Sequence, residues 1–131
     1  MRILFLVDVV GNSGCSKILS NLLSQKELNK IDFVIVNGEN AAEAGVGLTK
    51  EICEDFFKCG VDVITTGNHV WDQKDIMKFI DNENRLLRPK NLFEPSPGKG
   101  FEVFQNEKNI KIGVLNLMGN VFMKKCDDVF E

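Results

Sequence analysis

RILFLVD at residues 2–8 begins a pattern that recurs as DFVIVNGEN at residues 32–40 and as VDVITTGNH at residues 61–69. In each stretch, a short apolar run without regular alternation ends at a polar residue or a glycine. Such runs are typical of strands that are buried on both faces of a parallel sheet. The pattern therefore predicts three parallel strands, at residues 2–7, 32–36 and 61–66.

Amphipathic segments separate and follow these strands. Residues 16–28, 49–59 and 71–82 carry apolar side chains at helical spacing, which predicts three helices. The side chains expected to face the sheet are Ile18, Leu19, Leu22 and Leu23 in the first segment, and Ile76, Phe79 and Ile80 in the third. Alternating strands and helices indicate βαβ units and an α/β fold.

The pattern changes after residue 89. Residues 92–100 contain two prolines and two glycines, which predicts a loop, and residues 101–104 and 110–116 then resemble an antiparallel hairpin. A length of 131 residues fits one domain. We therefore expect a single α/β domain with a mostly parallel sheet, flanking helices and a late hairpin.

The composition excludes several classes of function. The chain has 16 basic and 19 acidic residues and a formal charge of −3, which argues against general nucleic-acid binding. No apolar run approaches the ~20 residues of a membrane-spanning helix, and the first residues make a poor signal peptide. Four cysteines without a C-x-x-C pair favour reduced thiols in a cytoplasmic protein.

Polar side chains follow each predicted strand where it ends. Asp8 follows the first strand, Glu39 and Asn40 the second, and Asn68 and His69 the third. Because ligands bind at the carboxyl ends of parallel strands, we expect these residues to lie together. Their oxygen and nitrogen donors suit manganese, iron or zinc, and Glu39 in the middle is placed to bridge two metal ions.

Each of these residues also has a structural interpretation. Asp8 can cap a turn, and Asn37 before a glycine is more readily explained as a turn residue than as a catalytic one. A lone histidine is more often a satisfied polar residue than a catalyst. The position of His69 at a strand end favours catalysis.

Together, several ordered motifs resemble the YmdB-like metallophosphoesterases, bacterial calcineurin-type proteins described as 2',3'-cyclic nucleotide phosphodiesterases. The motifs are DVVG at residues 8–11, NGENAA at 37–42, GNHVWD at 67–72, RP at 88–89, PGKG at 97–100 and NLMG at 116–119. The resemblance implies an αββα sandwich and a site for two divalent metal ions, iron or manganese. It also implies a metal-dependent phosphodiesterase whose small-molecule substrate is a 2',3'-cyclic nucleotide.

The resemblance assigns a role to each residue of this set. Asp8 would bind the first metal, Glu39 would bridge both metals and Asn68 would bind the second. Asn40 would contact metal or phosphate. A metal-activated water would attack the phosphorus, and His69 would be the acid that protonates the leaving ribose oxygen, a role that suits imidazole near neutral pH.

The resemblance covers only the N-terminal half of the family, whose second half supplies further histidine ligands. Residues 1–131 are therefore expected to form a partial metallophosphoesterase domain with an incomplete ligand set, weak or inactive alone. A homo-oligomer or a complementary C-terminal fragment is the expected partner. The alternative is a truncated non-catalytic remnant, or a partial domain that binds a nucleotide or a complementary subunit.

Overall fold

A four-stranded parallel sheet forms the centre of the molecule in the computed structural model, which describes residues 1–92, 95–123 and 126–127. The strands lie side by side in chain order: β1 (Ile3–Leu6), β2 (Phe33–Asn37), β3 (Val63–Thr65) and β4 (Leu86–Leu87). The three apolar runs of the sequence are thus confirmed as parallel strands. The sequence did not predict β4, because two leucines are too short a run to give a pattern.

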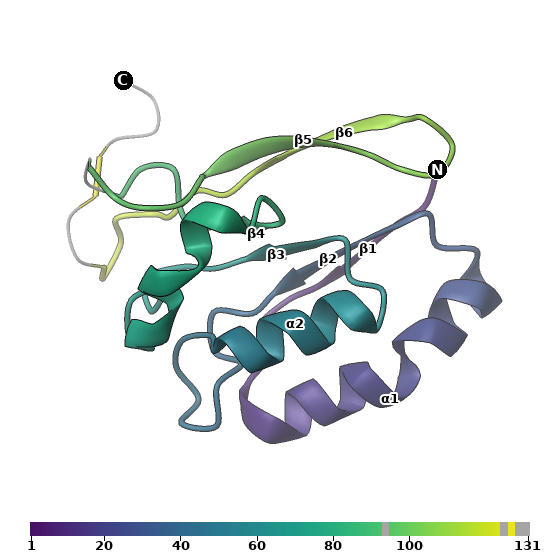
Figure 1. Ribbon diagram of the computed structural model, residues 1–131, viewed down its shortest axis with the longest axis horizontal. Coiled ribbons are helices and arrows are strands. Elements are labelled where there is room, and N and C mark those ends of the chain that lie inside the picture. The colour runs from purple at the N-terminus through teal and green to yellow at the C-terminus, as the bar shows by residue number, and fades with distance from the viewer. Residues whose placement is uncertain (93–94, 124–125, 128–131) are drawn as a thin grey trace.

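Two α-helices cover one face of this sheet (Figure 1). Helix α1 (Gly11–Asn29) begins five residues earlier than the sequence predicted, and α2 (Lys50–Lys58) begins after Thr49, whose hydroxyl accepts a hydrogen bond from the Ile52 amide. Between helices and sheet lies the main apolar core, which includes the fully buried Phe56.

The apolar stripe predicted for the first helix is only partly buried. Leu22 is buried and Ile18 packs against the core, as expected. Leu19 and Leu23 instead remain 40% and 59% exposed. The buried face of α1 is therefore narrower than the sequence pattern indicated.

The third predicted helix, residues 71–82, is not an α-helix. It consists of turns followed by two short 3-10 helices, η1 (Lys74–Lys78) and η2 (Ile80–Asn82). The amides of Ile76, Phe79 and Asn82 each bond the carbonyl three residues earlier. Ile76 and Ile80 are buried as predicted. A 3-10 helix has three residues per turn, so the apolar spacing could not distinguish it from an α-helix.

The predicted hairpin is confirmed and covers the other face of the sheet. Strands β5 (Phe101–Gln105) and β6 (Lys111–Leu115) pair antiparallel as a separate two-stranded sheet. Ile112 and Val114 pack against Phe33, Val63 and Leu87 of the parallel sheet. The chain thus forms helix, sheet and hairpin layers in that order, as Figure 1 shows, three of the layers that an αββα sandwich contains.

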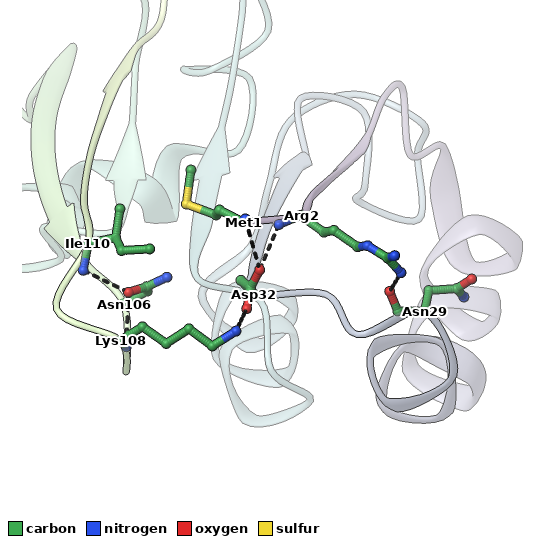
Figure 2. A network of polar contacts seen from close by, with 7 residues as sticks. All are labelled: Met1, Arg2, Asn29, Asp32, Asn106, Lys108 and Ile110. Carbon is green, nitrogen blue, oxygen red and sulfur yellow. Dashed lines mark hydrogen bonds and ion pairs between the residues drawn. The ribbon is translucent and has the colours of Figure 1, made fainter.

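Polar contacts join the hairpin to the parallel sheet at both ends. At one end, the buried Asn116 amide donates to the carbonyls of Thr66 (2.8 Å) and Leu87 (3.0 Å). At the other, Asp32 accepts hydrogen bonds from the Arg2 amide (2.6 Å) and from the Lys108 ammonium in the hairpin turn (Figure 2). Both bonds, the Lys108 bond most strongly, lower the pKa of Asp32.

Apolar side chains remain exposed on two surfaces of the described chain. Ile3 and Phe5 pair in register with β2 residues that face the hairpin, yet they are 45% and 53% exposed because the hairpin does not cover β1. The outer face of the hairpin carries Phe101, Val103 and Leu115, each about half exposed. The hairpin is therefore apolar on both faces, a pattern typical of an interior layer.

The four cysteines are free thiols, and burial raises the pKa of the Cys53 thiol to about 12. A thiol with so high a pKa is mostly protonated at neutral pH and therefore a poor nucleophile.

In the part of the chain that the structure describes, no helix has the length and apolarity needed to cross a membrane.

Candidate active site at the carboxyl ends of the strands

Asp8 and Asn40 meet beyond the ends of β1 and β2. Asp8 has a left-handed backbone conformation with φ of 53°, which aspartate tolerates better than most residues. Asn40 forms a parallel β-bridge with Val10, which brings the two loops together. The Asn40 Nδ2 donates a hydrogen bond of 2.8 Å to Asp8 Oδ1. The Asn40 carbonyl oxygen, Oδ1, is thereby left available to a ligand.

Glu39 is held from both its backbone and its side chain. The Asn37 Oδ1 accepts from the Glu39 amide (3.2 Å), and the Glu39 carbonyl accepts from the Gly47 amide (2.6 Å). The carboxylate lies directly against Gly67, where a Cβ atom would be 2.1 Å from Glu39 Oε2. Only glycine at position 67 allows this approach. Asn37 has the structural role that its sequence context indicated.

His69 lies between Glu39 and a residue that sequence analysis missed. Its backbone amide donates to Glu39 Oε1 (3.2 Å), and its ring Nδ1 lies 2.7 Å from Asp72 Oδ2. The carboxylate three residues after the histidine was visible in the sequence. Without the fold, however, nothing indicated that it would turn back to the ring.

The five predicted site residues thus gather at one edge of the sheet, but not as a closed cluster. Asp8 contacts Asn40, and Glu39 contacts His69. The Asn68 side chain makes no hydrogen bond to the described part of the chain. Within residues 1–92, 95–123 and 126–127, no three histidine, cysteine, aspartate or glutamate side chains are arranged to hold a metal ion.

The hairpin does not contribute Asn116 to this edge as a free polar group. Asn116 follows the last strand and lies against Thr66 and Leu87, at the ends of β3 and β4. Its buried Nδ2, however, donates to the carbonyls of both Thr66 and Leu87. Asn116 is therefore a structural link between the layers.

Proteins of similar sequence are phosphodiesterases or phosphatases by name. The chain is 43% identical over 130 residues to the 2',3'-cyclic-nucleotide 2'-phosphodiesterase of Bacillus subtilis, and the match covers 99% of this chain and 48% of that protein. It is 38% identical over 123 residues to a putative phosphatase/phosphodiesterase of Mycoplasma pneumoniae, covering 91% and 43% of the two chains. The chain therefore spans about half the length of these relatives.

Solved structures of related sequence share the fold of this chain over about half of their own length. A hypothetical protein from Thermus thermophilus superposes with a TM-score of 0.91 at 35% identity, over 99% of this chain and 50% of that one. A novel phosphatase from Mycoplasma pneumoniae superposes with a TM-score of 0.82 at 38% identity, over 92% and 43%. The family model described as YmdB-like protein matches residues 4–131. Since that match spans nearly the whole sequence, the chain belongs to the YmdB-like protein family.

Proposed function

We propose that this chain provides the N-terminal part of the active site of a metal-dependent phosphodiesterase acting on 2',3'-cyclic nucleotides. The observation that carries the proposal is the convergence of Asp8, Asn40, Glu39 and His69 at the carboxyl edge of the sheet. The name of the Bacillus subtilis relative supplies the substrate class. Residues 1–131 would then be a partial metallophosphoesterase domain.

The donor atoms at this edge fit part of a site for two divalent metal ions. Asp8 and Glu39 offer carboxylate oxygens, and Asn40 and Asn68 offer amide oxygens, which suit manganese or iron in this mixed set. Asn40 can use Oδ1 because its Nδ2 is already bonded to Asp8. The metal ions would activate water and stabilise charge on the phosphoryl group.

The protein groups have separable tasks in this proposal. Glu39 would be the carboxylate that holds both metal ions, since it follows the middle of the three strands and is fixed by the His69 amide and by Gly67. The His69 side chain is about one third exposed and can reach a bound ligand. It acts as the general acid that protonates the leaving ribose oxygen.

The remaining ligands would come from a second polypeptide segment, equivalent to the other half of the relatives. The chain covers 48% of the Bacillus subtilis protein, and its hairpin is apolar on both faces. The uncovered faces of β1 and of the hairpin would then be covered by that second half. On its own, the chain is expected to be weakly active or inactive.

A complementation assay tests this function. The chain is assayed on a 2',3'-cyclic nucleotide with Mn²⁺ or Fe²⁺, alone and after co-expression with the second half of the Bacillus subtilis relative. We expect turnover in the complemented sample, lost in Asp8→Ala, Glu39→Ala and His69→Ala but retained in the surface variant Asp75→Ala. If the two halves form a complex that does not hydrolyse the cyclic nucleotide, the proposed phosphodiesterase activity is wrong.

The alternative is a non-catalytic remnant or partial domain that binds a nucleotide or a complementary subunit. The observation that favours it is the open ligand set within the described residues. Calorimetric binding of the cyclic nucleotide to the chain alone, with no hydrolysis after complementation, would support this alternative over the enzyme.

A further inference from the structure

The contact between His69 and Asp72 specifies which ring nitrogen carries a proton. Nδ1 lies 2.7 Å from Asp72 Oδ2. An ionised carboxylate can only accept hydrogen bonds, so the Nδ1 of His69 must be the donor. The other ring nitrogen, Nε2, makes no hydrogen bond to the described part of the chain. The ring is thus bonded to protein on one side and open on the other.

Asp72 is held in place by its neighbours. Its backbone amide donates to the His69 carbonyl (3.1 Å), so both main chain and side chain return to His69. The next residue, Gln73, donates from Nε2 to the Val46 carbonyl (2.9 Å). The buried Val70 and Ile76 anchor the segment on either side. The fold therefore sets the backbone position from which the Asp72 carboxylate reaches the ring.

We propose that Asp72 is a positioning residue, which holds His69 in the Nδ1–H tautomer and leaves Nε2 to exchange a proton with the substrate. This inference rests on the proposed function, since it adds a partner to the proposed acid. When the doubly protonated ring gives its Nε2 proton to the leaving ribose oxygen, the Nδ1–H tautomer remains. That tautomer is the one that Asp72 stabilises by accepting from Nδ1.

A nearby ion pair on the surface provides a comparison for the contact between His69 and Asp72. Asp75 and Lys78 are also three residues apart, with their charged atoms 3.5 Å from each other and the lysine 80% exposed. Exposed pairs of this kind contribute little. The Asp72 side chain is about as exposed as that of Asp75, at 45% against 48%, but its contact is shorter, at 2.7 Å, and its partner is the ring of a histidine that is only 36% exposed. Asp75→Ala is therefore a matched control from the same segment.

Nuclear magnetic resonance can test the tautomer directly, because His69 is the only histidine. With ¹⁵N-labelled histidine at about pH 9, where an imidazole is ordinarily neutral, two-bond ¹H–¹⁵N correlations distinguish the protonated ring nitrogen. We expect the Nδ1–H form in the unmodified chain and in Asp75→Ala. In Asp72→Ala we expect that form to be lost in favour of Nε2–H, which a solvated histidine side chain prefers in water.

Two results would overturn the proposal: an Nε2–H ring in the unmodified chain, or an unchanged Nδ1–H ring in Asp72→Ala. Circular dichroism checks that the variant is folded, and the spectrum of the unmodified chain decides the matter even if it is not. The measurement needs neither metal nor substrate. It therefore separates failure of this inference from failure of the proposed enzyme.

The complemented enzyme provides the functional readout. Groups that orient the ligand residues of a metal site typically contribute about 10- to 100-fold to activity or metal affinity, and a similar effect is expected for a group that orients the acid. We therefore expect kcat to fall by about that factor in Asp72→Ala, with KM nearly unchanged and Asp75→Ala unaffected. A change in KM alone would assign Asp72 to substrate binding and contradict the positioning role.

Discussion

At the scale of single residues, the candidate site depends on close approach more than on charge alone. Glu39 reaches His69 only because position 67 has no side chain. Asp8 presents its carboxylate from a left-handed backbone conformation that costs most residues roughly 1–2 kcal/mol. Non-ideal backbone of this kind is common at functional sites. The backbone conformation of Asp8 and the missing side chain at Gly67 thus set where the carboxylates of the candidate site lie.

Gly67→Ala should disconnect Glu39 from His69 without unfolding the chain. The added Cβ would lie 2.1 Å from a carboxylate oxygen at the end of a flexible side chain, which can move aside. A hydrogen bond to a charged group is worth about 1.5–3 kcal/mol. Amide hydrogen exchange of His69 should therefore become about tenfold faster or more, while the melting temperature changes little.

Gly119→Ala is the control for this measurement, because a Cβ there meets no atom within 4 Å. If the amide of His69 exchanges at an unchanged rate in Gly67→Ala, the hydrogen bond from that amide to the Glu39 carboxylate does not depend on the glycine.

At the scale of elements, the second helix owes part of its stability to its first turn. Thr49 accepts a hydrogen bond from the Ile52 amide at the N-terminus of α2. Loss of such a cap typically costs about 1 kcal/mol. Thr49→Ala should therefore lower the free energy of unfolding by about that amount in urea titrations, whereas Thr49→Ser should keep most of it. Equal losses in both variants would argue against the cap.

Long, strongly patterned elements could be predicted from the sequence, and short or ambiguous ones could not. The runs that contain Ile3 and Val34 gave the parallel strands because burial on both faces leaves a continuous apolar signature. Leu86 and Leu87 form a strand only because β3 offers an open edge. The apolar spacing of Ile76 and Phe79 fits two kinds of helix. Such choices are made by tertiary contacts.

The candidate site shows the same division. Asp8, Glu39 and His69 could be proposed because they follow predicted strands, and the ends of parallel strands share one edge. Asp72 could not, because its contact depends on a turn that returns the chain to His69. The proposed roles of the five predicted residues stay predictions until metal and substrate are tested.

At the scale of the whole molecule, Asp32 links the hairpin layer to the N-terminal edge of the parallel sheet (Figure 2). The Lys108 hydrogen bond is the main reason why the pKa of Asp32 is lowered, and the Arg2 amide is the next. A carboxyl group with a lowered pKa in the folded state stabilises the fold when ionised. The ionised Asp32 makes its full contribution to stability at pH values above the pKa of an aspartate in the unfolded chain, about 3.9.

Asp32→Asn should therefore destabilise the protein at neutral pH, and the difference from the unmodified chain should shrink as the pH falls through the folded-state pKa of Asp32. Urea unfolding at a series of pH values between about 2 and 7 measures this. A difference that stays constant over the whole range would show that the ionised carboxylate is not what stabilises the layers.

The outer face of the hairpin makes a second prediction at this scale. If the second half of the fold covers Val103, then Val103→Lys should weaken complementation with the Bacillus subtilis fragment by at least about tenfold in a titration, as burying an unpaired charge would. Leu28→Lys on α1 is the control, since Leu28 is 76% exposed on the helical side. If the chain instead associates with itself and Val103→Lys abolishes that association, a second copy of the chain is what covers the outer face of the hairpin.

The order of the strands in the parallel sheet also bears on how the polypeptide is made. Each strand from β2 to β4 pairs with the one synthesised just before it. At a synthesis rate of about 5–20 residues per second, each of these strands therefore emerges when its partner has already been synthesised. Translation delivers β5 and β6 after all four parallel strands, so every strand of the sheet that the hairpin covers is available when the hairpin emerges. The strand order thus limits exposure only of the sheet face that the hairpin covers, because the outer face of the hairpin stays exposed in this chain.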